Sequence, residues 1–417
     1  MEKKYLYFQP EYVSQFKCDG SKCNARCCKG WSIDIDEKSY EQYSHIEPPE
    51  TAKEITSCIE FDSERKTHTM TLKPNCFCPM LTEKNLCRLQ ADYGEEFLSQ
   101  TCTTYPRRTY AVGDFFERAL LLSCPVAAEM ILFVQEPLRF HFVEVSEKVH
   151  DNGGKMIINS ACTNKFSADE VFEIQGAMLA ILQERRLSIN QRLIVLGFFC
   201  DKLEELLGIE ASSKEELFRL INALKRTIAS YNPNVFLRNG VPPVIQSIRF
   251  NPKKFVALMM TIFESIYVNA LQQGDVSGKY LTAVIAVLNI APNNNHHASV
   301  EEVAANYTAL SDARKKFEEL YSTFLENYLA NEFFLNLYPW KFDASITKNF
   351  IVFAATYKVF ELIIFSATLK GFDNKEELLS MVDWFTRKIN HSDALQKKIL
   401  DILKDDDDFL DLMEMLL

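Results

Sequence analysis

Apolar residues recur at helical spacing through most of the chain beyond residue 166. No fixed-period repeat is visible, so the pattern predicts an irregular set of helices rather than a solenoid. Residues three and four positions apart share one face of a helix. The first apolar stripe has near this spacing and consists of Val171, Ile174, Met178, Ile181 and Leu182. Similar stripes run through residues 214–230, 253–272, 302–335, 346–370, 375–390 and 394–416.

Three serines mark helix starts in this region. Each is followed three residues later by a glutamate, at the spacing that lets the two residues satisfy each other's free backbone amides. Turns rich in proline and asparagine, such as residues 232–234 and 291–295, separate the predicted helices. The serine–glutamate pairs are Ser167 with Glu170, Ser213 with Glu216, and Ser299 with Glu302.

The most apolar stretch, residues 351–369, carries Lys358 and Glu361 near its middle. A membrane-spanning helix needs roughly 20 predominantly apolar residues, and two central charges make insertion expensive. We therefore expect a buried core helix and no membrane association. The opening residues, MEKKYLYFQPEYV, lack the apolar core of a signal peptide, which predicts a cytoplasmic protein.

The first 125 residues follow a different pattern. Short alternating runs such as residues 67–72 predict strands, and turns at residues 48–49, 74–75 and 113–114 interrupt them. Residues 149–164 are typical of a linker or turn. We expect a mainly α protein, with a cysteine-rich metal-binding domain of short strands and loops over residues 1–150 and an irregular α-helical domain over residues 151–417.

Composition narrows the possible partners. The chain is 47% hydrophobic and 25% charged, as in ordinary globular proteins. Its net charge of -11 argues against a nucleic-acid partner, because neutralising phosphates requires an excess of lysine and arginine. An acidic surface is compatible with a cationic partner, but usually it only keeps a protein soluble. We expect a monomer.

Ten of the twelve cysteines lie in the first 124 residues. In a reducing compartment such clustering indicates metal or redox chemistry rather than disulfides. Thiolates bind zinc or iron–sulfur clusters in preference to hard cations. Because four thiolates can hold either group, the cysteine spacing does not distinguish zinc from an iron–sulfur cluster. It also does not show whether the cysteines form one site or two. Nine cysteines form the candidate ligand set: Cys18, Cys23, Cys27, Cys28, Cys76, Cys78, Cys87, Cys102 and Cys124.

The local spacing suggests how these thiols are presented. If residues 23–28 form a helical turn, Cys23 and Cys27 share one face, and Cys28 projects about a quarter-turn away, to a second site or into the core. On a strand, Cys76 and Cys78 would face the same side. The remaining cysteines are expected to be small buried hydrophobes: Cys58, Cys162 and Cys200.

The cysteine motifs resemble those of bacterial flagellin lysine-N-methylases of the FliB type. The strongest is FxCxGSxCxxxCCKGW over residues 16–31, followed by CPML at 78–81, CRL at 87–89, TCTTYPR at 101–107 and ERALLLSCP at 117–125. The cysteine spacing is also similar to that of the YkgJ group of zinc- or iron-chelating proteins. Weaker similarity to FliB-type proteins occurs at residues 326–331, 338–339 and 388–391.

The resemblance implies a protein-lysine N-methyltransferase that transfers methyl from S-adenosylmethionine to flagellin. It also implies a cysteine-bound iron–sulfur cluster; we expect the 4Fe–4S type, with zinc as the alternative metal. Two familiar cofactor motifs are absent from the sequence. Gly30 stands where a Cx3Cx2C motif beginning at Cys23 would need its third cysteine, and no GxG tripeptide occurs among the thirteen glycines.

Candidate catalytic and cofactor residues lie beside the cysteines. Lysine methylation requires a neutral amine, and tyrosines or carboxylates can take its proton or guide it. Tyr105 is the candidate catalytic residue, although it could also be a packed structural tyrosine. Arg107, with Arg108 beside it, could bind the carboxylate of S-adenosylmethionine or could simply be solvated. Arg118 could bind the same carboxylate and Glu117 the ribose hydroxyls, with a local ion pair near Cys124 as the alternative for these two residues.

Two other functions fit the same cysteines. The YkgJ-like pattern is compatible with a non-catalytic protein that chelates or delivers zinc or iron. Alternatively, zinc could merely fold the N-terminal domain of an interaction scaffold.

Overall fold

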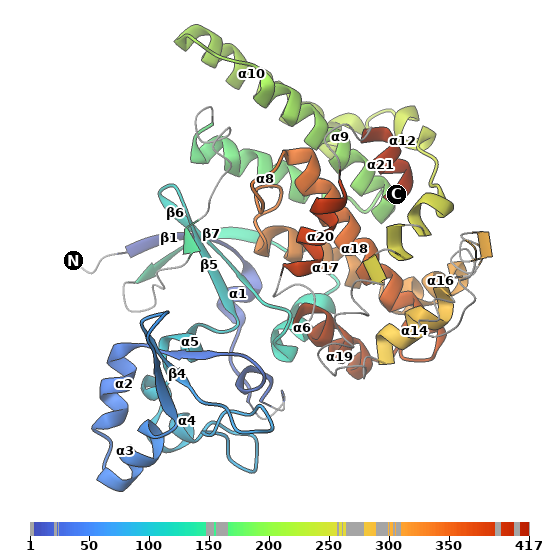
Figure 1. The fold of residues 1–417 in the computed structure, drawn as a ribbon. Coiled ribbons are helices and arrows are strands. Elements are labelled where there is room, and N and C mark those ends of the chain that lie inside the picture. Colours follow the sequence, from blue (N-terminus) through green and yellow to red (C-terminus); the bar gives the residue numbers. More distant parts are fainter. Residues whose placement is uncertain are drawn as a thin grey trace. The chain divides into compact units, whose positions relative to one another are not determined.

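The computed structural model divides the chain into two compact units (Figure 1). The first comprises Met1–Thr109, Glu117–Met130 and Phe140–Gly153, and the second comprises Tyr110–Phe116, Ile131–Arg139 and Gly154–Leu417. The structure describes residues 4–20, 23, 25–146, 154–155, 166–256, 258–260, 262–263, 279–288, 299, 301–302, 305, 310–387, 393–403 and 409–416. Of the features predicted from the sequence, Cys162, residues 264–272 and residues 388–391 lie outside this description.

The fold is mainly α, as the sequence predicts, and the helices concentrate in the second unit. The predicted serine–glutamate caps are formed at Ser167, Ser213 and Ser299. The helices are α8 (Ala168–Leu182), α9 (Ile189–Gly208), α10 (Lys214–Ser230), α11 (Pro233–Phe236), α12 (Pro243–Ser247), α14 (Lys279–Leu288), α16 (Ser311–Leu320), α17 (Phe324–Leu335), α18 (Ile346–Leu369), α19 (Lys375–Phe385), α20 (Ala394–Ile402) and α21 (Phe409–Leu416).

Helix α18 forms the centre of the second unit. It packs against α9, α14, α16 and α20. By length and composition it could cross a membrane, yet its apolar window is 100% buried inside the protein. The prediction of a buried core helix is therefore confirmed, and Lys358 and Glu361 are buried with it.

Helices α9, α18 and α21 approach closely at Gly197. A Cβ atom there would lie 2.8 Å from Phe350 Cε1 and 2.8 Å from Met413 Sδ. We expect Gly197→Ala to lower the free energy of unfolding by about 1–3 kcal/mol, because overpacking a filled core displaces its side chains. Denaturant unfolding measures the change. Gly176→Ala in α8 is the control, because no described atom lies within 4 Å of its Cβ position; an equal loss in both variants would contradict the steric explanation.

The first unit contains a three-stranded sheet and most of a five-stranded sheet. The five-stranded sheet has the order β7-β1-β6-β5-β8 and the smaller one the order β2-β4-β3. The predicted alternating run is strand β4, which pairs with β3 so that Ile59 opposes Met70. The strands are β1 (Lys4–Pro10), β2 (Ile33–Ile35), β3 (Ile59–Asp62), β4 (Thr67–Met70), β5 (Arg107–Val112), β6 (Phe115–Leu120), β7 (Phe140–Ser146) and β8 (Gly154–Lys155).

Short helices connect these strands. They are α1 (Glu11–Gln15), η1 (Arg26–Cys28), α2 (Glu37–Ser44), α3 (Pro49–Thr56), α4 (Arg88–Tyr93), η2 (Glu95–Phe97), α5 (Gln100–Thr104) and α6 (Pro125–Leu132). Asp36 caps α2 by accepting from the Ser39 amide at 3.1 Å, and it also accepts from the Gln100 amide at 2.8 Å. One carboxylate thus fixes the starts of α2 and α5.

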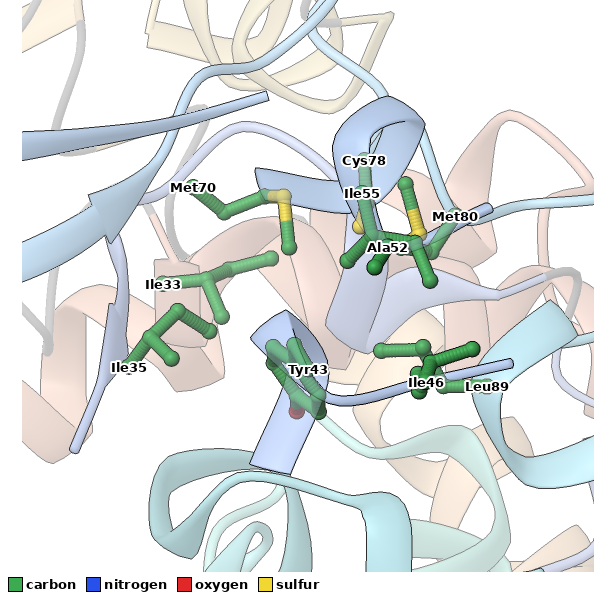
Figure 2. Packing of buried hydrophobic residues seen from close by; sticks show 10 residues of the cluster. All are labelled: Ile33, Ile35, Tyr43, Ile46, Ala52, Ile55, Met70, Cys78, Met80 and Leu89. Carbon is green, nitrogen blue, oxygen red and sulfur yellow. The ribbon is translucent and has the colours of Figure 1, made fainter. Parts of the chain in front are cut away.

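The small sheet and the helices beside it share a core of ten buried side chains, which Figure 2 shows. Cys78 is a member of this core, and four further cysteines pack against it: Cys28, Cys58, Cys87 and Cys102. The buried members are Ile33, Ile35, Tyr43, Ile46, Ala52, Ile55, Met70, Cys78, Met80 and Leu89. We call this set the small core.

Candidate metal and cofactor site

An open cavity of about 1020 Å³ lies within the first unit. Its wall comes from three stretches of the chain, residues 16–42, 90–107 and 118–126. This volume is at the upper end of the range for small-molecule sites, about 300–1,000 Å³. Five cysteines from the candidate set line it: Cys18, Cys23, Cys27, Cys102 and Cys124.

Local backbone structure positions these thiols. Cys102 lies in α5, where its amide donates to the Ser99 hydroxyl at 3.3 Å. Cys124 precedes α6, and the amides of Val126 and Ala127 donate to its sulfur. A helix N-terminus offers unpaired N–H groups, and these favour a negatively charged sulfur.

The helical turn expected across residues 23–28 is not formed. Ala25 has the left-handed φ of 53°, and the helical residues are restricted to the 3-10 turn Arg26–Cys28. A residue in this conformation interrupts a right-handed helix. Cys23 and Cys27 nevertheless line the same cavity, whereas Cys28 packs against the small core. Of the two positions left open for Cys28, a second site or the core, the structure places it against the core.

The strand expected at Cys76 and Cys78 is also wrong. Cys76 has a φ of 63° and is exposed, while Cys78 is buried in the small core. The Cys78 amide donates to the carbonyl of Cys28 at 2.8 Å. In the described part of the chain, Cys76 belongs neither to the cavity wall nor to the small core.

Burial keeps most of these thiols protonated when no metal is bound. It raises the pKa of Cys78 and of Cys124 to about 12, and that of Cys102 to about 11, and neighbouring thiols add to the effect. A hydrogen bond to Cys27, whose Sγ lies 3.7 Å away, raises the pKa of Cys28. Because metals bind thiolates, metal binding would have to release these protons.

The donor chemistry fits a thiolate-bound metal or iron–sulfur cluster. Sulfur atoms from three chain segments line the cavity, and the backbone amides of Val126 and Ala127 favour the thiolate form of one of them, Cys124, as is usual around thiolate ligands. Among the described residues, no three side chains of the ligand types already form a coordination group. Binding would therefore draw the thiols together, which couples it to local folding.

Tyr105 lies on the cavity wall. Its hydroxyl is 3.0 Å from Ser123 Oγ, and its ring packs against Trp31 with centroids 5.9 Å apart. The side chain is therefore both packed and accessible to the cavity. Both alternatives that the sequence left open are compatible with this position.

Arg107 and Arg118 also lie on the wall. The Arg118 guanidinium is 4.0 Å from the centroid of the Tyr7 ring, and its Nε donates to Thr109 Oγ1 at 3.0 Å. Glu117 is buried and directly precedes Arg118 in strand β6. Successive residues of a strand face opposite sides of the sheet, so these two side chains lie on different faces. Arg118 lines the described cavity wall and Glu117 does not, so a ligand in this cavity would meet Arg118 alone; a cofactor role for Glu117 stays a prediction.

Several charged wall residues were missed by sequence reasoning. Burial raises the pKa of Cys18, and so do its neighbours Cys27, Cys23, Glu95 and Asp19. Only closeness in sequence to Cys18 could have indicated Asp19, and nothing in the sequence pointed to Glu95. The other missed charged residues are Lys17, Arg26, Asp36, Lys38 and Glu96.

Comparisons with known proteins agree on one family. The model for the FliB lysine N-methylase C-terminal domain matches residues 175–417, more than half of the chain. The flagellar biosynthetic protein FliU of Salmonella muenchen is 31% identical over 133 residues, which are 31% of this chain and 79% of FliU. No solved structure matches.

Two lysine-N-methylases give a similar result. Those of Salmonella typhimurium strain LT2 and Salmonella choleraesuis strain SC-B67 are each 31% identical over 133 residues, which are 31% of this chain and 33% of theirs. The similarity therefore spans about a third of the length of these two enzymes. The family resemblance expected from the sequence is confirmed, whereas the likeness to the YkgJ group stays a prediction.

Proposed function

The chain belongs to the FliB lysine N-methylase family, and from this premise we propose that it methylates lysine side chains of flagellin with S-adenosylmethionine as methyl donor. The observation that carries the proposal is the cavity of the first unit. Thiols, a tyrosine and two arginines that the sequence singled out meet on its wall. We propose that the protein acts as a monomer in the cytoplasm.

The two arginines would hold the carboxylate of S-adenosylmethionine. Arg118 is only 4% exposed and is fixed by Thr109 and the Tyr7 ring. The guanidinium of Arg107 lies 5.2 Å from the centroid of the Phe16 ring, and its Nη2 donates to the Phe16 carbonyl at 3.4 Å. Guanidinium groups held in one orientation lose little entropy when they bind a carboxylate.

Four of the five cavity thiols would hold a 4Fe–4S cluster, with zinc as the alternative metal. The five are Cys18, Cys23, Cys27, Cys102 and Cys124. Held by four thiolates, such a group would have no open coordination position and would supply a redox centre; a Lewis-acid position near the methyl donor would require one of the thiols to stay unbound. The remaining requirements fall to the protein's own side chains.

The substrate lysine must reach the methyl group as a neutral amine. Asp19 and Glu95, on the same wall, would attract the cationic side chain and accept its proton. Tyr105, oriented by Ser123, would guide the amine. These roles follow from position on the cavity wall and from the charge of each group.

Incubation of the anaerobically purified protein with flagellin and methyl-labelled S-adenosylmethionine tests the proposal. We expect label on flagellin lysines, located by mass spectrometry, and an absorption near 400 nm if the metal is an iron–sulfur cluster. A flagellin with its exposed lysines replaced by arginine is the control. Absence of label while the metal centre is intact would count against the enzyme and favour a metal-chelating protein.

Replacement of Arg118 tests the cofactor position. A hydrogen bond to a charged group contributes about 1.5–3 kcal/mol, so Arg118→Met should raise the KM for S-adenosylmethionine by about 10- to 100-fold. Arg118→Lys, which keeps the charge, should lose less. Arg139→Met, at an exposed arginine, is the matched control. An unchanged KM in a folded Arg118→Met protein would exclude this role.

A further inference from the structure

Residues 217–263 carry seven lysines and arginines and no aspartate or glutamate. The whole chain has the opposite balance, with 46 lysines and arginines against 57 acidic residues, all of which lie outside this stretch. Lys253 pairs with Glu301 at 2.9 Å, and Lys254 pairs with Asp411 at 2.8 Å. The other five cations are exposed, and no salt bridge joins them to a residue that the structure describes. They are Arg219, Lys225, Arg226, Arg238 and Arg249.

Three of these five cations lie on the exposed side of helix α10, which Figure 1 shows extending outward from the other helices of the second unit. The apolar side of α10 packs against α8, α9 and α11, and Leu220 and Leu224 are buried there. The acids of this helix, Glu215 and Glu216, lie in its first turn, where they complement the helix N-terminus. Residues seven positions apart share a helix face, and the three cations form two such pairs with one another and with Phe218. We call this set, Phe218, Arg219, Lys225 and Arg226, the α10 outer face.

Phe218 is the most exposed large apolar side chain among the described residues, at 67%. It lies off the apolar side of α10, so the contacts of that side do not cover it. Val235 in α11, which packs on α10, is also exposed. A single exposed apolar residue needs no explanation, but aromatic residues and arginine together are typical of protein–protein interfaces, from which lysine and glutamate are depleted. Lys225 also attracts Glu170 of α8, so the two arginines are the main charges of this face.

A protein fits the α10 outer face better than a membrane or a nucleic acid does. A helix that lies on a bilayer inserts its apolar side, but the apolar side of α10 is turned into the protein, which leaves only Phe218 to insert. Nucleic acid is disfavoured by the net charge of -11. An acidic protein segment complements the face locally, because salt screens the remaining acidic surface beyond about 8 Å.

We propose that the α10 outer face docks an acidic segment of the protein substrate. The proposal rests on the proposed function, since it takes flagellin as that substrate. The cavity of about 1020 Å³ can hold a cofactor and a lysine side chain but not a folded protein, so recognition of a whole protein requires a further surface. Binding energy from remote parts of a substrate serves to position its reacting group. Carboxylates of the segment would pair with Arg219 and Arg226, and an apolar side chain would cover Phe218.

Binding of purified flagellin to the full chain tests this docking face. Arg219→Glu with Arg226→Glu should weaken the affinity by about 10- to 100-fold at low salt, and Phe218→Ser should weaken it by about 10-fold. Arg219→Lys with Arg226→Lys should lose less, because the charge is kept. Raising the salt concentration should weaken binding by the unmodified protein but should have little effect on the binding that remains in the charge-reversed variant.

Matched controls make the same changes elsewhere on the second unit. Lys315→Glu with Lys397→Glu reverses two exposed lysines, in α16 and α20. Leu320→Ser, at the end of α16, removes an apolar side chain that is 55% exposed. Both controls should bind flagellin as the unmodified protein does. Circular dichroism and the melting temperature show that each variant is folded.

Unchanged flagellin affinity in the folded Arg219→Glu/Arg226→Glu protein overturns the proposal, and so does an unmodified protein that does not bind flagellin. Vesicles of equimolar phosphatidylcholine and phosphatidylglycerol are the second probe. Vesicle binding that the charge reversal abolishes would assign the face to a membrane and also overturns the proposal.

Failure of the docking face and failure of the enzyme give different results, because the binding assay does not involve methyl transfer. Flagellin that binds through this face but receives no methyl group contradicts the proposed enzyme alone. Flagellin that is methylated and binds equally well to the charge-reversed variant contradicts the docking face alone.

Discussion

Cys27→Ser is expected to reduce the proposed lysine methylation to background and to release the metal proposed for the cavity. Cys27 lies on the cavity wall, and its thiol acts electrostatically on Cys18, Cys28, Cys78, Cys87, Cys102 and Cys124. No other cysteine recurs in all of these interactions. Serine has nearly the same shape but offers a hard oxygen in place of a soft sulfur, so the variant should fold around a ligand set that is one donor short.

Metal content and methyl incorporation into flagellin measure this effect together. Cys58→Ser should retain both, since Cys58 is absent from the described cavity wall, and Cys200→Ser in α9 should do the same. Loss of methylation with full metal retention would assign Cys27 a role other than ligation. Retention of both properties would exclude Cys27 from the site.

The helices show where sequence periodicity succeeds. Helices with one apolar face and a serine–glutamate cap, such as α8 and α10, were predicted near their observed bounds. Helix α9 was missed. It begins with Ser188 and Gln191 rather than serine and glutamate, and it is buried on most sides. A helix enclosed by protein shows no single apolar stripe, because its polar face is missing.

The cysteine site shows where periodicity fails. Clustering and chemistry identified the ligand candidates, but their arrangement depends on left-handed residues at Ala25 and Cys76. Neither residue is a glycine, so no sequence signal marked these turns. Long-range backbone pairing, such as that between Cys78 and Cys28, is equally invisible to local spacing.

The second unit also buries several charged side chains, and the composition of the chain does not predict which charges are buried. Glu326, 3% exposed, accepts from Arg192 at 2.7 Å and from Arg185 at 2.9 Å. In α18, Lys358 Nζ is 2.9 Å from Glu361 Oε2, and both residues are 1% exposed. Two networks thus neutralise charges that would otherwise be costly in the interior of the second unit.

The Lys358–Glu361 pair has further hydrogen-bond partners in the folded protein. Lys358 also donates to Asn190 Oδ1 at 2.8 Å, and Tyr357 donates to Glu361 Oε1 at 2.9 Å. Burial lowers the pKa of Lys358 despite the attraction of Glu361. Burial pushes the pKa of Glu361 upward, but Lys358 and Arg314 hold it below the usual value. The carboxylate therefore depends on its cationic neighbours.

We expect Lys358→Met to destabilise the second unit by about 3–5 kcal/mol, because it leaves a buried carboxylate without its main partner. Lys358→Met with Glu361→Gln should recover much of this loss, since the amide still accepts from Tyr357 and carries no charge. Lys202→Met in α9 is the matched control: Lys202 pairs with Glu205 at the same sequence spacing but on the surface, where such pairs contribute about 0–1 kcal/mol. Denaturant unfolding of the three variants gives the comparison.

The pH dependence of this loss identifies its cause. In the unmodified protein the lowered pKa of Glu361 contributes stability above its unfolded value near 4.5, and this contribution is lost as the pH falls through the folded pKa. Without Lys358, burial should raise the folded pKa of Glu361 above the unfolded one, so the carboxylate becomes a cost that grows with pH between those two values. The destabilisation by Lys358→Met should then be smaller at pH 5 than at pH 8. A loss independent of pH, and equal in the double variant, would instead mean that the lysine side chain stabilises α18 through packing alone.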